Sequence, residues 1–181
     1  SAEIKTVVFK RNFRDARPTT CSQWFGFCTN LTSIEGLENL NTSDVTRMDN
    51  MFYKCGQLRA LDLSGFNTEK VKNMADMFGN CKNLEMLNLS SFKTNDLTNM
   101  SRMFYECNKI AQLDLSGFNT SGVKALDQVF KNCYALESLD LSSFDTRLVT
   151  DMSSLFDNCQ SLKTIYVSDR FSTYRVKYST N

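Results

Sequence analysis

Apolar residues in this chain recur at a fixed interval of 26 residues. The recurring positions form four series, which are Phe52, Phe78, Phe104, Phe130 and Phe156; Cys55, Cys81, Cys107, Cys133 and Cys159; Leu61, Leu87, Leu113, Leu139 and Ile165; and Phe66, Phe92, Phe118 and Phe144. A period of about 20–50 residues is typical of a solenoid, whose units each bury an apolar face against their neighbours. The pattern therefore predicts a repeat protein.

Each repeat begins with a segment typical of a short strand. Leu58, Leu61 and Leu63 are apolar, and alternation places Leu61 and Leu63 on one strand face. The pattern predicts strands over 58–64, 84–90, 110–116, 136–142 and 162–168, and an initial strand over 4–9. Stacked in register, the repeat strands predict one parallel sheet with a strand from each repeat.

The second half of each repeat is typical of tight turns. Phe66 and Thr68 follow the strand expected over 58–64. Apolar residues then recur at spacings of three, three and one, at Val71, Met74, Met77 and Phe78. Such spacing predicts short 3₁₀ or α turns with their apolar side inward. We expect the polar residues that open these turns to cap them, at Asn73, Asn99 and Asp151.

These elements predict an α/β repeat solenoid. The pattern L-x-x-L-x-L-S-x-F-x-T is a variant of the leucine-rich-repeat consensus. We therefore expect a leucine-rich-repeat-like right-handed coil, with a concave parallel β-sheet and short α or 3₁₀ turns on the convex side. The chain is interpreted as one domain over 1–181, with an N-terminal cap and lead-in over 1–30, repeats over 31–165, and a degenerate last coil or C-terminal cap over 166–181.

The repeat is irregular near both ends. Cys28 and Cys55 are 27 residues apart, which predicts one inserted residue near 35–37. Phe171 also lies one place late relative to Phe144. Alternating apolar residues after it, at Tyr174, Val176 and Tyr178, predict a final edge strand. That strand would either cap the stack or mark a truncation.

The repeat resembles that of a known family. The stretches M-F-Y-K-C at 51–55, L-D-L-S-G-F-N-T at 61–68, V-K-N-M at 71–74 and A-R-P-T-T at 16–20 are similar to the 26-residue repeat of the BspA-like bacterial surface leucine-rich-repeat family. The resemblance extends over about 4–173. It implies a secreted or cell-surface protein of bacteria, or of eukaryotic microbes that share the repeat, and a role in adhesion to host proteins or other cells.

Charge and hydropathy narrow the classes of partner. The net charge is +1, from 21 basic and 20 acidic residues, so no strong field favours nucleic acid. No apolar run approaches the roughly 20 residues that span a bilayer. The chain begins at Ser1, and we take it as a mature or excised fragment. We expect a monomer that does not insert into a membrane.

The cysteine and histidine content bears on metal sites and catalysis. The seven cysteines include five at one repeat position, which predicts a ladder of buried thiols. Cys21 and Cys28 are the better candidates for a disulfide. The chain has no histidine and no C-x-x-C motif, so we expect no zinc site, no cofactor and no Ser-His or Cys-His catalysis.

One polar row is a candidate binding surface. It occupies one strand position in successive repeats, at Glu35, Asp62, Asn88, Asp114, Asp140 and Tyr166. These residues flank inward-pointing leucines, so they should face out from the concave sheet. The row is either an acidic strip for a cationic ligand or a calcium ion, or a solvated row whose carboxylates bond nearby hydroxyls and water. A glycosidase-type acid pair is disfavoured because an open sheet does not exclude water.

These observations predict a non-enzymatic surface or secreted protein that binds an extracellular protein or glycan through the concave sheet or an exposed rim. The alternative is a structural spacer or stalk of a larger surface protein. The ligand itself is not specified by the pattern.

Overall fold

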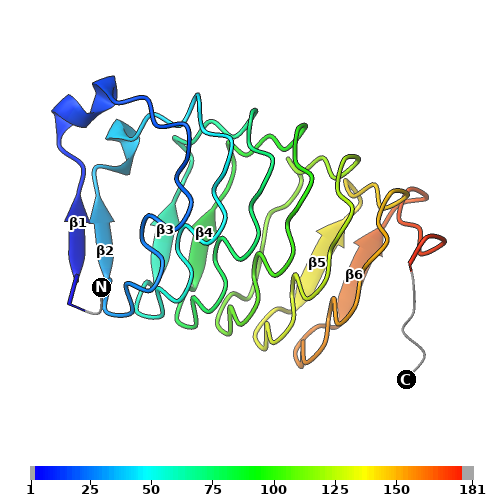
Figure 1. Ribbon diagram of the computed structural model, residues 1–181. Helices are drawn as coiled ribbons and strands as arrows, with labels where there is room; N and C mark the ends of the chain where they lie inside the picture. The colour runs from blue at the N-terminus through cyan, green and yellow to red at the C-terminus, as the bar shows by residue number, and fades with distance from the viewer. Residues whose placement is uncertain (1–2, 177–181) are drawn as a thin grey trace.

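Figure 1 shows the computed structural model of the chain, in which residues 3–176 are described. The chain winds through successive coils that lie side by side, from the blue N-terminal end to the red C-terminal end. The described residues form six short strands and two 3₁₀ helices, in the order β1 (Thr6–Val8), η1 (Arg11–Asp15), β2 (Ser33–Glu35), η2 (Leu37–Asn39), β3 (Ala60–Asp62), β4 (Met86–Asn88), β5 (Ser138–Leu141) and β6 (Thr164–Val167).

The strands pair in parallel, each with its equivalent in the next coil. Three two-stranded sheets result, in which β1 pairs with β2, β3 with β4, and β5 with β6. The register places repeat-related residues opposite each other, for example Leu61 opposite Leu87 and Leu139 opposite Ile165. The predicted parallel pairing of successive repeats is therefore confirmed for these three pairs.

The prediction of one continuous sheet was wrong. Residues 110–116 form no strand, which separates β4 from β5. One backbone bond, from the amide of Glu137 to the carbonyl of Ala111 (3.1 Å), still connects this segment to the next coil. Ala111 and Asp114 are residue types that are depleted in strands. The three-residue strand β3 has the same residue types at Ala60 and Asp62, so residue type alone does not explain why 110–116 forms no strand.

A second ladder of backbone bonds runs along the turn segments. Isolated parallel bridges connect six coils without interruption, through Thr20, Arg47, Asn73, Asn99, Ala125 and Asp151. In one coil, the amides of Met74, Asp76 and Phe78 donate to carbonyls 25 residues later in the chain, at 2.9–3.0 Å. The turn segments, and not the sheets, are therefore the continuous hydrogen-bonded part of the stack.

The short turns predicted in these segments are present and bury their apolar residues, but their geometry is neither 3₁₀ nor α-helical. Amides that alternate with those bonded to the next coil bond within their own coil and close i→i+3 turns. For example, the amide of Met77 donates to the carbonyl of Met74 (3.1 Å). Each coil has two non-glycine residues in the left-handed region, such as Asp76 (φ 52°) and Asn80 (φ 61°). A left-handed residue ends helical geometry. Within residues 3–176, helices occur only as η1 and η2, near the N-terminus.

The predicted turn caps are confirmed. The side-chain oxygens Oδ1 of Asn73, Asn99 and Asp151 each accept the backbone N–H two residues later, at 3.0, 3.0 and 2.9 Å. Short Asx turns of this kind satisfy a backbone donor that the turn leaves without a partner.

The aromatic and cysteine series lie in the core. The rings of Phe52, Phe78 and Phe104 stack at centroid distances of 5.7 Å with interplanar angles of 3–9°, and the stack continues to Phe130 and Phe156 at 5.8 Å. In the cysteine series, each of the five thiols donates a hydrogen bond of 3.0–3.2 Å to the backbone carbonyl of a phenylalanine in the preceding coil. The two series therefore form one structural unit, in which ring stacking and thiol bonds both connect neighbouring coils.

The inserted residue is found where the spacing predicts it. Gly36, in the left-handed region (φ 71°), begins η2, and this helix takes up the extra residue between the second and third strands. At the other end, residues 172–176 form no strand, so the predicted edge strand is absent at Tyr174 and Val176. Tyr178 lies outside the described residues.

The structure shows short strands that pair in parallel between successive coils of the chain. The right-handed sense, the concave curvature and the domain boundaries at 1–30, 31–165 and 166–181 stay predictions.

Candidate functional site

The candidate site is the row of outward-facing strand residues, which we call the strand-face row. It consists of Glu35, Asp62, Asn88, Asp114, Asp140 and Tyr166, all of which are exposed. Two pairs are direct cross-strand neighbours, Asp62 with Asn88 and Asp140 with Tyr166. Glu35 instead pairs with Val8 on β1. The structure therefore places all six predicted residues on the solvent side, but only some of them adjacent in a sheet.

Strand alternation explains why the row faces solvent. In β5, Leu139 and Leu141 are buried at 1% and 0% exposure, and Asp140 between them is exposed. The same alternation holds around Asp62, between buried Leu61 and Leu63. A shift of one residue would place a carboxylate in the core, so the buried leucines fix the row in place.

Four members of the row also support the turn that follows each strand. Oδ1 of Asp62, Asn88, Asp114 and Asp140 accepts the backbone N–H of the serine two residues later, at distances of 3.0, 3.1, 3.0 and 2.8 Å. The Ser116 hydroxyl additionally donates to Asp114 at 2.7 Å. The row therefore accepts the backbone amides of the turns that follow the strands, through three carboxylates and the side-chain amide oxygen of Asn88.

These hydrogen bonds keep the carboxylates ionised. The pKa of Asp62 lies below its ordinary value, chiefly because the Ser64 backbone amide donates to it. The pKa values of Asp114 and Asp140 are lowered by side-chain and then backbone hydrogen bonds from Ser116 and Ser142. A hydrogen bond to the charged form favours that form. The row therefore carries negative charge at neutral pH.

One part of the row borders a shallow hollow. Asp114, Asp140 and Tyr166 line a space of about 340 Å³, together with Gln112, Leu113 and Ser138. Tyr166 is 57% exposed. The hollow thus combines two fixed negative charges with an exposed aromatic ring. Such a set suits a cationic side chain or a hydroxyl-rich group with an apolar face.

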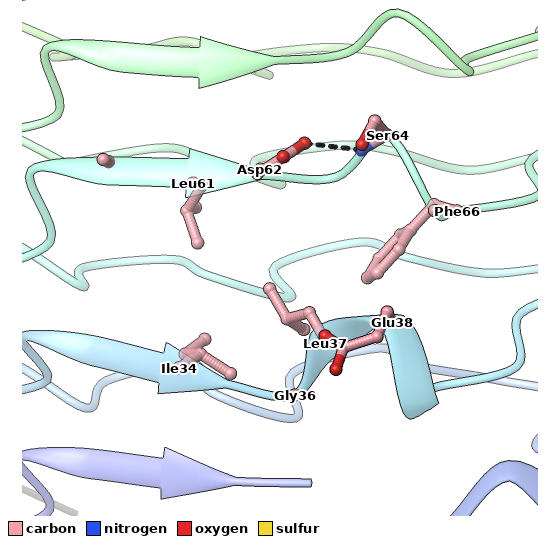
Figure 2. A pocket seen from close by; sticks show the side chains of 10 residues that line it. Ile34, Gly36, Leu37, Glu38, Leu61, Asp62, Ser64 and Phe66 are labelled. Carbon is pink, nitrogen blue, oxygen red and sulfur yellow. Dashed lines mark hydrogen bonds between the residues drawn. The ribbon is translucent and has the colours of Figure 1, made fainter. Parts of the chain in front are cut away.

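A second hollow lies where the repeat is irregular (Figure 2). It has a volume of about 210 Å³ between the coils of β2 and β3, and Gly36, Leu37, Glu38, Asp62 and Phe66 are among its lining residues. Glu38 comes from η2, the helix that takes up the inserted residue. The one-residue insertion was the sequence signal for this hollow, but side chains such as Glu38 were not predicted as part of a site. Glu35 and Asn88 line neither hollow.

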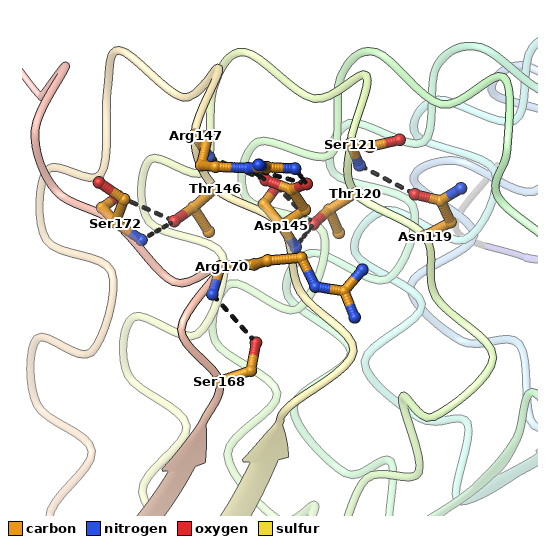
Figure 3. Close-up of polar contacts among 9 residues, drawn as sticks. All are labelled: Asn119, Thr120, Ser121, Asp145, Thr146, Arg147, Ser168, Arg170 and Ser172. Atoms are coloured by element: carbon orange, nitrogen blue, oxygen red, sulfur yellow. Dashed lines mark hydrogen bonds and ion pairs between the residues drawn. The ribbon is translucent and has the colours of Figure 1, made fainter.

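A polar cluster in the last coils was also missed by sequence reasoning (Figure 3). Asp145 is 7% exposed and forms an ion pair with Arg147 at 2.6 Å, which lowers the pKa of Asp145. The Thr120 hydroxyl accepts the Asp145 amide at 2.8 Å, and the Thr146 hydroxyl accepts the Ser172 amide at 2.6 Å. The cluster joins neighbouring coils, and its contacts are those of the fold.

Metal binding, a disulfide and a membrane-spanning helix are the other features considered for this chain. Within residues 3–176, no three Cys, Asp or Glu side chains are grouped so that they could hold a metal ion. Cys21 is a buried thiol, so the disulfide considered between Cys21 and Cys28 is not formed. None of the helices in this part of the chain is both long and apolar enough to span a bilayer.

Comparisons with known proteins match the chain to a family and show distant similarity to solved structures. Residues 19–137 and 87–180 match a family described as "Mycoplasma protein of unknown function, DUF285". No curated protein sequence matches the chain. A solved structure of a leucine-rich cell surface protein from Faecalibacterium prausnitzii is similar, with 17% identity and a TM-score of 0.44. The similarity covers 91% of this chain and 43% of that one, so the chain spans less than half the length of that protein.

Proposed function

The chain belongs to the DUF285 family, and on that premise we propose that it is a module of a surface or secreted protein that binds a protein or glycan through the strand-face row. The repeat motifs that resemble the BspA-like family support this location outside the cell and an adhesive role. Sequence motifs, rather than distant structural similarity, support that part of the proposal.

The observation that carries the binding proposal is the hollow bordered by Asp114, Asp140 and Tyr166. The fold explains the two aspartates as acceptors for the serine amides, but each carboxylate has a second oxygen that the backbone does not use. Tyr166 is more than half exposed, although tyrosine is among the residues that most often dominate binding energy at interfaces. The ligand would be a protein with a basic side chain or a glycan whose ring stacks on Tyr166.

We propose a non-enzymatic role for the same surface. A glycosidase needs one carboxyl group with a raised pKa, so that it can donate a proton to the leaving group. The pKa values of both Asp114 and Asp140 are lowered, and the hollow is shallow. The carboxylates are therefore suited to binding a cation or accepting hydrogen bonds.

A spacer or stalk role is the second candidate, and a specific observation favours it. Four members of the row serve the fold by accepting a serine amide, which gives a structural reason for their presence in each coil. In that case the row would bind nothing, and recognition would lie elsewhere in a longer protein.

A charge-removal experiment separates the two roles. Asn88 accepts the Ser90 amide as the aspartates accept theirs, so Asp114→Asn and Asp140→Asn should keep the turns while removing the charge. Binding of the chain to extracellular-matrix proteins and to glycan arrays would be measured for the unaltered protein, the double Asn variant and Tyr166→Ala. We expect at least a tenfold loss of affinity in both variants, about 1.4 kcal/mol or more.

The matched control is Asp96→Asn, which removes the same charge from an exposed residue of a turn segment. Binding should be unchanged in this variant. If the unaltered chain binds none of these ligands, or binds them equally well after the double substitution, the strand-face proposal is wrong and the spacer role is favoured.

A further inference from the structure

The hollow between the coils of β2 and β3 combines apolar walls with two carboxylates (Figure 2). Its apolar lining consists of Ile34, Leu37, Ala60, Leu61 and Phe66. Glu38 and Asp62 supply the carboxylates, and none of the lining residues is basic. A space of about 210 Å³ therefore offers apolar contact and negative charge together.

The helix that carries Glu38 is held firmly in place. Gly36, at its start, lies so close to the preceding coil that a Cβ atom there would be 2.2 Å from the Phe9 carbonyl oxygen. Asn39, at its end, donates to the same carbonyl at 3.0 Å and accepts a bond from Arg14 at 2.8 Å. Both neighbours of Glu38 along η2 are thus fixed by contacts of the fold, which lowers the cost of ordering this side of the hollow when a ligand binds.

The Glu38 side chain has no partner among residues 3–176. Eight other carboxylates in this part of the chain form ion pairs with lysine or arginine, whereas Glu38 forms neither an ion pair nor a side-chain hydrogen bond. Arg14 lines the adjoining hollow that also borders Glu38, but its Nε atom donates to Asn39. Asp62 accepts the Ser64 amide and likewise has no ion pair within the described part. The two negative charges of the hollow are therefore available to a ligand.

We propose that this hollow binds the side chain of a lysine or arginine on a partner protein. Long basic side chains lay their hydrocarbon stem along apolar surface and keep the charged head among polar groups. The stem would contact Ile34, Leu37 and Leu61, and the head would donate to the carboxylates of Glu38 and Asp62, as charge-assisted hydrogen bonds.

Other ligands suit the hollow less well. The described residues contain no group of three Cys, Asp or Glu side chains that could hold a metal ion. A sugar ring would need an exposed aromatic face to stack on, and Phe66, the aromatic residue of the lining, is only 2% exposed. Charge and shape together therefore favour a basic side chain.

This site goes beyond the proposed function and does not depend on it. Glu38 lies outside the strand-face row, and Asp62 is the member of that row that lines the hollow. Asp114, Asp140 and Tyr166 border a different hollow. Binding at the β2–β3 hollow can therefore be measured separately from binding at the other one.

The test is a titration of the full chain followed residue by residue by NMR, which detects the weak binding expected of exposed ion pairs. The probes are three blocked tripeptides with lysine, arginine or norleucine between two glycines. Norleucine keeps a hydrocarbon stem but has no charge. We expect saturable shifts of the backbone amides of Gly36, Glu38, Asp62 and Ser64 with the lysine and arginine peptides, and none with the norleucine peptide.

Removal of the two charges should weaken this binding. We expect Glu38→Gln combined with Asp62→Asn to raise the Kd about fivefold or more, because two charge-assisted bonds are lost. Asp62→Asn should keep its turn, since Asn88 accepts the equivalent serine amide. The matched control is Glu137→Gln, at an exposed glutamate that lines neither hollow, and its Kd should be unchanged.

A second variant blocks the hollow without changing its charge. Ala60 lines the hollow and lies opposite Met86 of β4, which is 67% exposed, so Ala60→Met introduces the residue type of the next coil on the same strand face. We expect it to abolish the shifts. The proposal is overturned if neither basic peptide gives saturable shifts, if the norleucine peptide binds equally well, or if Ala60→Met binds normally. Shifts confined to the residues around Asp114, Asp140 and Tyr166 would also overturn it, while supporting the strand-face proposal.

Discussion

At the scale of single residues, buried threonines connect the coils. Thr94 is fully buried, and its hydroxyl donates to the carbonyl of Asn119 (2.9 Å) and accepts the amide of the same residue (2.8 Å). Thr42, Thr68 and Thr120 bond in the same way to the residue 25 positions later in the chain. One side chain thus satisfies both backbone groups of a residue in the next coil.

Replacing this hydroxyl should be costly. Thr94→Val keeps the shape of the side chain but leaves the N–H and the carbonyl of Asn119, a half-buried residue, without their partner. We expect the free energy of unfolding to fall by about 1–3 kcal/mol, the usual cost of an unsatisfied buried group. Urea unfolding measures the change. Thr98→Val is the control, because Thr98 is exposed and donates only to the Lys72 carbonyl (3.0 Å); an equal loss in both variants would contradict the explanation.

At the scale of elements, η2 depends on one glycine. A Cβ atom on Gly36 would lie 2.2 Å from the carbonyl oxygen of Phe9, and the backbone there is left-handed. Asn39, at the end of η2, donates to the same carbonyl at 3.0 Å and accepts a bond from Arg14 at 2.8 Å. The inserted residue is therefore accommodated by a close contact between the first two coils.

Gly36→Ala should disrupt this contact. A left-handed alanine costs about 1–2 kcal/mol, and overpacking adds about 1–3 kcal/mol, so we expect a loss of roughly 2–5 kcal/mol. Gly56→Ala is the matched control, since a Cβ there would meet no atom closer than 3.8 Å. Thermal unfolding of the two variants should differ clearly, and similar melting temperatures would show that the close approach is not required.

The aromatic stack is the other element that should dominate stability. Phe104 is fully buried between Phe78 and Phe130, with centroid distances of 5.7 and 5.8 Å. We expect Phe104→Ala to cost about 3–5 kcal/mol, as is typical of a large buried aromatic residue. Tyr174→Ala, at a residue that is 92% exposed, should change stability by less than about 0.5 kcal/mol. An unchanged denaturation midpoint for Phe104→Ala would contradict this role.

The elements also show which features a sequence can reveal. Alternation around Leu61 and Leu63 predicted the position of the strand, and the 27-residue interval between Cys28 and Cys55 predicted the insertion, because both depend on local spacing. The apolar spacing of Met74, Met77 and Phe78 correctly predicted short turns but wrongly suggested 3₁₀ or α geometry for them, because other i→i+3 turns share this spacing. The bonds that decide between them join residues 25 apart, and their geometry includes left-handed residues such as Asp76 that the pattern does not mark.

The same limit applies to the site. The outward position of Asp114 and Asp140 follows from alternation and was predicted. Bonds from these carboxylates to nearby hydroxyls and water were one of two alternatives, but bonds from the serine backbone amides were not foreseen. The hollow shared with Tyr166 depends on the arrangement of three coils. The exposure of Ile165 (38%) was not foreseen, because its position in the repeat is the same as that of buried Leu139.

At the scale of the whole molecule, the buried thiols make stability depend on pH. Burial raises the pKa of Cys21 and of Cys55 to about 12, and it raises the pKa values of Cys81 and Cys107 strongly. In an unfolded chain, thiols ionise near pH 8.5. Above that pH the unfolded state binds fewer protons than the folded state, so stability decreases as pH rises toward 12.

We therefore expect the urea midpoint to fall between pH 8 and pH 10.5, with each such thiol contributing up to about 1.4 kcal/mol per pH unit. Cys55→Ala should lower stability at pH 8, because a bond to the Phe25 carbonyl is lost, but should reduce the slope above pH 9. Comparing the slopes of stability against pH for the unaltered protein and Cys55→Ala separates the contribution of this thiol from that of lysines and tyrosines, which titrate in the same pH range. Parallel curves for the two proteins would contradict the thiol explanation.

From Arg47 onward, the bridges connect equivalent residues at intervals of 26, and this has a consequence for how such a gene can change. Removal of one complete coil, for example residues 82–107, would join Cys81 to Asn108, so that Phe78 would meet Phe130 and Asn73 would meet Ala125. The new neighbours are the same kinds of residue as the old ones. Recombination between misaligned copies of the repeat can therefore lengthen or shorten the protein by whole coils, and each product inherits working contacts without further mutation.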